Sequence, residues 1–282
     1  MLIKNLIETT IEDILLSKDK IIRFDIDFNE NIDFLEKSQI EELIFENYGK
    51  FNQPLNKLPV SLRKLKVPRN FSYKIEYFPP DLQELTICSD YNYELNNLPA
   101  GLIELYLYND TNYNFDNLPN SLKILRAGNR DIKIIILPLN LKELILPRYH
   151  LYKIEVFPPN LEKLQLSYYY NFSLNNLPNK LIKLIIAGGP REYQDRDDNN
   201  YINYPEFNQD INNLPDSIEE IDICVTSYNL PIIKLPKNLD TIMFHVLEHV
   251  NTPDIEEINM GDIMFFCRCM SCKNNFFIER YT

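Results

Sequence analysis

The hydrophobic positions of the chain recur in a unit of about 20 residues, which is typical of a repeat fold. Most units contain a Leu-Pro or Phe-Pro pair, with an apolar residue three positions before it and a Leu-x-x-Leu-x-Leu pattern after it. The pairs begin at Leu58, Phe78, Leu98, Leu118, Leu137, Phe157, Leu177, Leu214 and Leu235. Two degenerate units, from Ile21 and Ile40, precede them, so the chain contains about eleven units.

The last residues of each unit alternate in the manner of a short β-strand. After Leu62, for example, Leu65 and Val67 fall on one face, and Lys64 and Lys66 fall on the other. The rest of the unit must return the chain to the next strand, and its proline favours extended backbone over helix. We therefore predict a solenoid with a parallel sheet of about eleven short strands, extended or irregular convex arcs, and little helix outside the caps.

The repeat pattern also predicts the organisation of the chain. Leu2 to Leu16 is amphipathic, and we expect a capping helix within residues 1–20. The repeat array then covers residues 21–244. Its period is interrupted once by an insertion at residues 187–206, whose glycines, proline and dense charge indicate an exposed loop.

One column of the repeat is mostly aromatic. Seven positions before the Pro-adjacent residue, the units carry Phe51, Phe71, Tyr91, Thr111, Arg130, His150, Tyr170, Phe207 and Tyr228. We expect these side chains to stack as a spine along the solenoid; the alternative is a ladder that binds a ligand. On the first interpretation, His150 is a packing residue and not a catalytic base.

Residues 245–282 no longer follow the repeat, and we expect them to form a C-terminal cap with a cysteine cluster. A helix start at Thr252 and two apolar strands around a turn are predicted there. Two thiolates and two imidazoles could hold a tetrahedral zinc ion. The candidate ligands are Cys269, Cys272, His245 and His249. Because a Cys-x-Cys pair is unusual in zinc knuckles, we favour reduced cap cysteines and expect no cofactor.

Composition narrows the possible partners and the location. A net charge of −12 argues against nucleic acid or an anionic membrane as the partner, since both require basic residues. No apolar stretch has the length of a membrane span. The N-terminal segment carries charges inside its apolar pattern, unlike a signal peptide, and the five cysteines do not form a secreted disulfide framework. We expect a cytoplasmic protein.

The repeat resembles a known family. "FNQPL" at Phe51 to Leu55 and "FNQDI" at Phe207 to Ile211 are similar to the first half of the FNIP repeat, a relative of leucine-rich repeats found in amoebae and in giant viruses of amoebae. "LPVSL", "LPNSL" and "LPDSI" at Leu58, Leu118 and Leu214 are similar to its second half. The resemblance implies an α/β-type, leucine-rich-repeat-like fold and a protein-binding role. Some relatives also carry an F-box that recruits a ubiquitin ligase, and residues 1–20 are too few for one.

The exposed face of the repeat sheet is where we expect a partner protein to bind. Tyrosine and arginine near the middle of such a face are common binding hot spots, because both offer a large contact area with a polar end. The candidate partner-binding residues are Glu104, Tyr106, Tyr108, Ile124, Arg126 and Ile145. The alternative is that exposed strand positions in this tyrosine-rich chain simply favour Tyr and Ile.

The sequence contains no glycine-rich phosphate loop, nucleophile elbow or metalloprotease helix. We therefore predict a non-catalytic protein–protein interaction module and not an enzyme. It would act in the cytoplasm, which is that of the host cell if the protein is viral. Two alternatives stay open: a substrate adaptor or competitor in a ubiquitin-ligase pathway, and a structural component of a virion. The sequence names neither the partner nor the oligomeric state.

Overall fold

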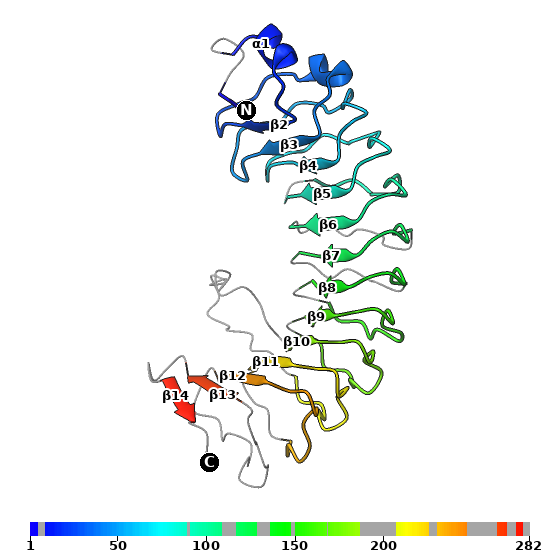
Figure 1. The fold of residues 1–282 in the computed structure, drawn as a ribbon, viewed down its shortest axis with the longest axis vertical. Coiled ribbons are helices and arrows are strands. Elements are labelled where there is room, and N and C mark those ends of the chain that lie inside the picture. The colour runs from blue at the N-terminus through cyan, green and yellow to red at the C-terminus, as the bar shows by residue number, and fades with distance from the viewer. Residues whose placement is uncertain are drawn as a thin grey trace. The chain divides into compact units, whose positions relative to one another are not determined.

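The computed structural model describes residues 1–4, 9–88, 91–108, 117–128, 136–147, 150–167, 169–186, 207–225, 230–246, 264–269 and 275–278. The chain divides into two compact units, Met1–Asn140 and Leu141–Thr282. In each unit the strands lie side by side in chain order, and the segments between them form arcs on one side of the sheet (Figure 1). This is the arrangement of a leucine-rich-repeat-like solenoid, as the repeat pattern predicts.

The strands of the first unit are parallel to their neighbours. They are β1 (Leu2–Ile3), β2 (Ile21–Phe24), β3 (Glu42–Phe45), β4 (Lys64–Lys66), β5 (Glu84–Ile87), β6 (Glu104–Leu107) and β7 (Ile124–Arg126). Among the described residues of this unit, the helices are α1 (Ile11–Leu16) and the 3-10 helix η1 (Asp33–Lys37). Both are short, so helix contributes little to the unit.

The second unit continues the same design. Its strands are β8 (Glu143–Ile145), β9 (Lys163–Gln165), β10 (Lys183–Ile186), β11 (Glu220–Val225), β12 (Thr241–Val246), β13 (Met264–Cys269) and β14 (Asn275–Ile278). Strands β8 to β13 are parallel, and β14 runs antiparallel to β13. The strands predicted from the repeat are β2 to β12, and β13 and β14 are the two strands predicted around a turn in the C-terminal cap.

The N-terminal cap differs from the prediction. The helix does not extend over Leu2 to Leu16, because Leu2 and Ile3 form β1 and pair with β2. There the backbone N–H of Arg23 donates to the carbonyl of Met1 at 2.9 Å, so β1 covers the edge of β2. Helix α1 begins at Ile11, where Thr10 and Asp13 form a capping box.

The proline of each unit positions the strand that follows it. Just before β4, the backbone N–H of Leu62 donates to the carbonyl of Pro59 at 3.1 Å and closes a β-turn. The hydroxyl of Ser61, inside this turn, donates to the carbonyl of Ile40 in the preceding unit at 2.8 Å. Ser121 and Ser217 make the equivalent bonds to the units before them. The Leu-Pro-x-Ser-Leu motif thus joins neighbouring units as well as turning the chain.

The Phe-Asn pair of the motif has two structural roles. Phe51 and Phe71 stack with their ring centroids 6.2 Å apart. The polar residue that follows each ring, Asn52 or Ser72, takes part in a ladder of hydrogen bonds beside the rings. The side-chain oxygen of Asn52 accepts the backbone N–H of Ser72 at 3.0 Å, and that of Asn29 accepts the N–H of Asn52 at 2.8 Å. The aromatic ring therefore fills the core while the polar residue pairs the backbone of the next unit.

The predicted spine is confirmed at its described positions in both units, while Thr111, Arg130 and Tyr228 lie outside the described residues. In the first, Phe71 also stacks on Tyr91 at 6.2 Å. In the second, His150 is fully buried and stacks on Tyr170 with 6.4 Å between ring centroids and 9° between ring planes. His150 is thus a packing residue, as expected, and burial of the column excludes a surface ladder at these positions.

No helix in the described part of the chain is long and apolar enough to cross a membrane. The insertion at residues 187–206 and the helix start predicted at Thr252 lie outside the described residues.

Candidate functional site

Strands β6 and β7 bring the predicted binding residues of the first unit together. The strand register pairs Glu104 with Ile124 and Tyr106 with Arg126, so these four side chains belong to adjacent positions of one sheet face. Each is half-buried. Tyr108 follows the end of β6, and 51% of its surface is exposed. The four paired positions therefore form a compact patch, with Tyr108 at its edge.

Ile145 was predicted as part of the same surface. It lies on β8 in the second unit, is half-buried, and pairs in register with Gln165 of β9. Ile145 is therefore part of the sheet face of the second unit.

Tyr106 is the centre of the patch and is held on two sides. The guanidinium carbon of Arg126 lies 5.2 Å from the centroid of the Tyr106 ring, which is a cation–π distance. The Tyr106 hydroxyl donates to the carboxylate of Glu104 at 2.5 Å. Burial raises the pKa of Tyr106, and the accepting, negatively charged Glu104 raises this pKa further. The two contacts orient the Tyr106 side chain, and its raised pKa keeps the hydroxyl protonated above the pH at which an exposed tyrosine ionises.

A second polar group lies beside this patch. Lys64 on β4 and Glu84 on β5 form an ion pair with 2.7 Å between nitrogen and oxygen. Glu84 is in turn the register neighbour of Glu104 on β6. Because Lys64 lies next to Glu84, its positive charge partly compensates the negative charges of the two adjacent glutamates.

Two positions on the outward face of the first unit's sheet are buried. Only 8% of Ile44 and 6% of Thr86 is exposed, although both occupy outward-facing strand positions. The register neighbours of Thr86 are Lys66 and Tyr106, whose longer side chains flank it on both sides. Sequence alternation gives the face of a residue, but the lengths of neighbouring side chains decide how much of it solvent reaches.

The zinc prediction stays untested. His245 lies on β12 and Cys269 on β13, where the register pairs His245 with Arg268 and Val246 with Cys269. The other candidates, Cys272 and His249, are outside the described residues. Within the ranges that the structure describes, no group of three His, Cys, Asp or Glu side chains could hold a metal ion.

Comparisons with known proteins agree with this architecture. The FNIP repeat model matches residues 150–188. CroV588, a giant-virus protein described as a novel circular leucine-rich-repeat protein, is similar in structure, with a TM-score of 0.51 and 21% identity over 94% of this chain and 48% of that one. YopM from Yersinia enterocolitica has a TM-score of 0.45 and 18% identity over 88% of this chain and 53% of YopM. No curated protein sequence matches.

This chain spans about half the length of both solved proteins. At these identities, the similarity to CroV588 concerns the fold alone. Solenoids of this kind are generally scaffolds for protein interaction and are typically non-catalytic. The repeat match and the shared fold together identify the chain as a leucine-rich-repeat-like solenoid that contains the FNIP repeat.

Proposed function

We propose that the protein is a non-catalytic interaction module that binds a partner protein on the exposed sheet face of its first unit. The observation that carries this proposal is the Tyr106–Arg126 pair, in which a neutral tyrosine is fixed between a guanidinium and a carboxylate. Tyrosine and arginine are the residue types that contribute most at binding hot spots. Here neither side chain has to be ordered by the partner, because intramolecular contacts already restrict both.

The surroundings of the pair suit a protein partner. Ile124 adds apolar surface on the adjacent strand, and Tyr108 extends the patch beyond the end of β6. The polar groups are held by one another and not by deep burial, so they can exchange partners at a surface. A side-chain pair ordered before binding lowers the entropic cost of association.

The proposed setting is the cytoplasm of an infected host cell. The FNIP repeat and the structural similarity to a giant-virus protein support a viral origin. Within this setting, two more specific roles are open to the same surface: presenting or competing for a target of a ubiquitin ligase, and assembly into the virion. The identity of the partner separates them.

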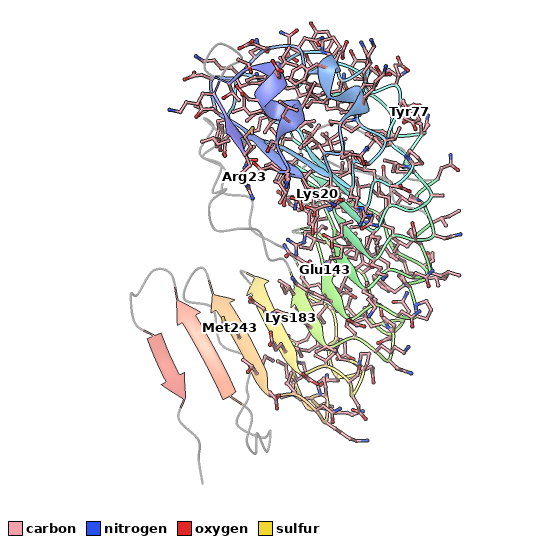
Figure 2. The ribbon with its side chains drawn as sticks, turned by 45° about the horizontal axis from the view of Figure 1, so that its top comes forward. Lys20, Arg23, Tyr77, Glu143, Lys183 and Met243 are labelled. Carbon is pink, nitrogen blue, oxygen red and sulfur yellow. The ribbon has the colours of Figure 1, made fainter. Side chains whose placement is uncertain are left out.

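The test compares partners captured from amoebal lysate by the full-length tagged protein. The variant Tyr106→Ala/Tyr108→Ala/Arg126→Ala removes the patch. The matched control, Tyr73→Ala/Tyr77→Ala/Lys57→Ala, removes two exposed tyrosines and one cation from the arcs of the same unit. Figure 2 shows Tyr77 on the arc side of the unit and Arg23 on the sheet side.

We expect a partner that is retained by the wild type and the control and lost from the patch variant, with both variants folded by circular dichroism. Subunits of a ubiquitin ligase among the captured proteins would support the adaptor role. Finding this protein in stoichiometric amount in purified virus particles would support the virion role. A partner that binds the patch variant as well as the wild type would refute the proposed surface.

A further inference from the structure

One exposed segment of the repeat array occurs twice in the chain. The tetrapeptide Tyr-Lys-Ile-Glu stands at residues 73–76 and again at residues 152–155, and Phe-Pro-Pro follows in both places after one intervening residue. The first copy belongs to the compact unit Met1–Asn140 and the second to Leu141–Thr282. No other repeat unit contains this tetrapeptide. We call Tyr73, Lys74 and Glu76 arc site 1, and Tyr152, Lys153 and Glu155 arc site 2.

The backbone of both arc sites is fixed in the same way by the next repeat unit. In arc site 1, the backbone N–H of Ile75 donates to the hydroxyl of Tyr91 at 3.2 Å. The side-chain amide of Asn97 donates to the carbonyl of Glu76 at 2.8 Å. The equivalent bonds of arc site 2 run from Ile154 to Tyr170, at 3.4 Å, and from Asn176 to Glu155, at 2.9 Å. Because both backbones are held at these points, a ligand does not have to order them.

The side chains of the two arc sites are also exposed to the same extent. Solvent reaches 42% of Tyr73 and 41% of Tyr152. Each tyrosine packs against a buried ring of the spine, Phe71 or His150, with 6.5 or 5.9 Å between ring centroids. Beside each ring, the lysine and the glutamate form an exposed ion pair, with 2.8 Å between nitrogen and oxygen in arc site 1 and 2.7 Å in arc site 2. Each arc site therefore offers a packed aromatic ring next to one cation and one anion.

The sheet face does not share this likeness. Figure 2 shows Tyr77, which directly follows arc site 1 in the chain, on the arc side of the unit. The outward-facing strand residues that come after the two arc sites are Glu84, Thr86, Glu104 and Tyr106 in one case and Lys163, Gln165, Lys183 and Ile185 in the other. All four positions differ, so duplication of the segment does not by itself account for the identical arc residues. Stability does not account for them either, since an exposed ion pair contributes only about 0–1 kcal/mol. A ligand common to both arc sites does.

The groups of each arc site suit a sugar. The apolar C–H face of a sugar ring packs on an aromatic ring such as that of tyrosine. Its hydroxyl groups both donate and accept hydrogen bonds, so they can bond to the glutamate carboxylate and to the lysine ammonium of the same site. A proline ring also packs on tyrosine, but it has no donor for the carboxylate. A polyanion is disfavoured, because cation and anion balance at each arc site and the whole chain has a net charge of −12.

We propose that the two arc sites bind a neutral carbohydrate of repeating structure, with one sugar ring on each tyrosine. A ligand that repeats offers the same contacts to both sites, and a long polymer that engages both at once binds more tightly than one that engages a single site. Binding uses the exposed part of each tyrosine and leaves its contact with the spine ring in place. This ligand occupies the arcs, so the inference goes beyond the protein partner proposed for the sheet face.

The test is affinity electrophoresis of the full-length protein in native gels that contain a soluble neutral polymer. The net charge of −12 moves the protein toward the anode, and binding to the polymer retards it. The polysaccharides are glycogen, mannan, hydroxyethyl cellulose and glycol chitin, each in its own gel. A further gel contains polyproline, which offers stacking rings without hydroxyl groups, and a gel without polymer gives the reference mobility.

The variants remove the proposed contacts one kind at a time. Tyr73→Ala, Tyr152→Ala and their combination remove the rings and leave the net charge unchanged. Glu76→Ala/Glu155→Ala removes both carboxylates and leaves the packing of the rings in place. The matched control is Tyr48→Ala, since 71% of Tyr48 is exposed and it lies outside both arc sites. Circular dichroism checks that each variant is folded.

We expect at least one polysaccharide to retard the wild type and Tyr48→Ala equally. Each single tyrosine variant should bind that polymer about tenfold more weakly, because one site is left and the gain from double engagement is lost. The double tyrosine variant and the double glutamate variant should migrate as they do without polymer.

Absence of retardation by all four polysaccharides would overturn the proposal, as would equal retardation of the wild type and the double variants. Loss of binding in one single tyrosine variant without any effect in the other would overturn the equivalence of the two sites and with it the repeating ligand. Stronger retardation by polyproline than by every polysaccharide would assign the arcs to a proline-rich protein segment instead. The proposed function fails separately, because it is tested with a captured protein partner and none of these variants changes β6 or β7.

Discussion

Replacing Leu105 by alanine tests how the sheet is held together. Leu105 is fully buried on β6, and its register neighbours, Leu85 and Leu125, are fully buried as well. Removing three buried carbons at about 0.8 kcal/mol each costs about 2.4 kcal/mol. Because both neighbours are fixed by strand pairing, they cannot close the space. A remaining cavity of about 50 Å³ adds about 1.2 kcal/mol at about 24 cal/mol per Å³.

We therefore expect Leu105→Ala to lower the free energy of unfolding by about 3.5 kcal/mol. The measurement is urea denaturation followed by far-UV circular dichroism, with the slope of the transition compared between variants. Leu139→Ala is the control, since 62% of Leu139 is exposed and the same substitution should cost less than about 0.5 kcal/mol. A cost below about 1 kcal/mol for Leu105→Ala at an unchanged slope would refute the rigid core.

Two further predictions concern polar groups of the first unit. Asn52→Ala should cost about 0.5–1.5 kcal/mol, because the backbone N–H of Ser72 loses its acceptor, whereas Asn52→Asp keeps that acceptor and should cost less. The same denaturation assay measures both variants, and equal costs would contradict the ladder. Tyr106 should still be protonated at a pH where exposed tyrosines have ionised, as measured by the absorbance difference between wild type and Tyr106→Phe, and Glu104→Gln should bring its pKa back toward the ordinary value. Since folding raises this pKa, its contribution to stability is complete below about pH 10 and declines as the pH rises above that value. Ionisation of Tyr106 together with the exposed tyrosines would contradict its placement against Glu104.

The candidate site was only partly predictable from sequence. Alternation along a strand places Tyr106 and Arg126 on the outward face, and both are found there. It does not reveal that Arg126 stacks on the Tyr106 ring, since the two residues are a whole repeat apart. Nor does it reveal that Thr86 is buried between longer neighbours. Such contacts depend on which side chains the register makes adjacent and on their lengths.

By itself, the sequence determined the repeat, the number of strands in the array, the aromatic spine and the identity of the core columns. These features follow from a local period, because each unit can bury its apolar residues only against copies of itself. Tertiary structure decided the features that have no period. They include the pairing of Leu2 and Ile3 with β2 in place of a longer helix, and the stacking of Arg126 on the Tyr106 ring. Their physical origin is the alignment of neighbouring strands, which brings together residues that are about 20 positions apart in the chain.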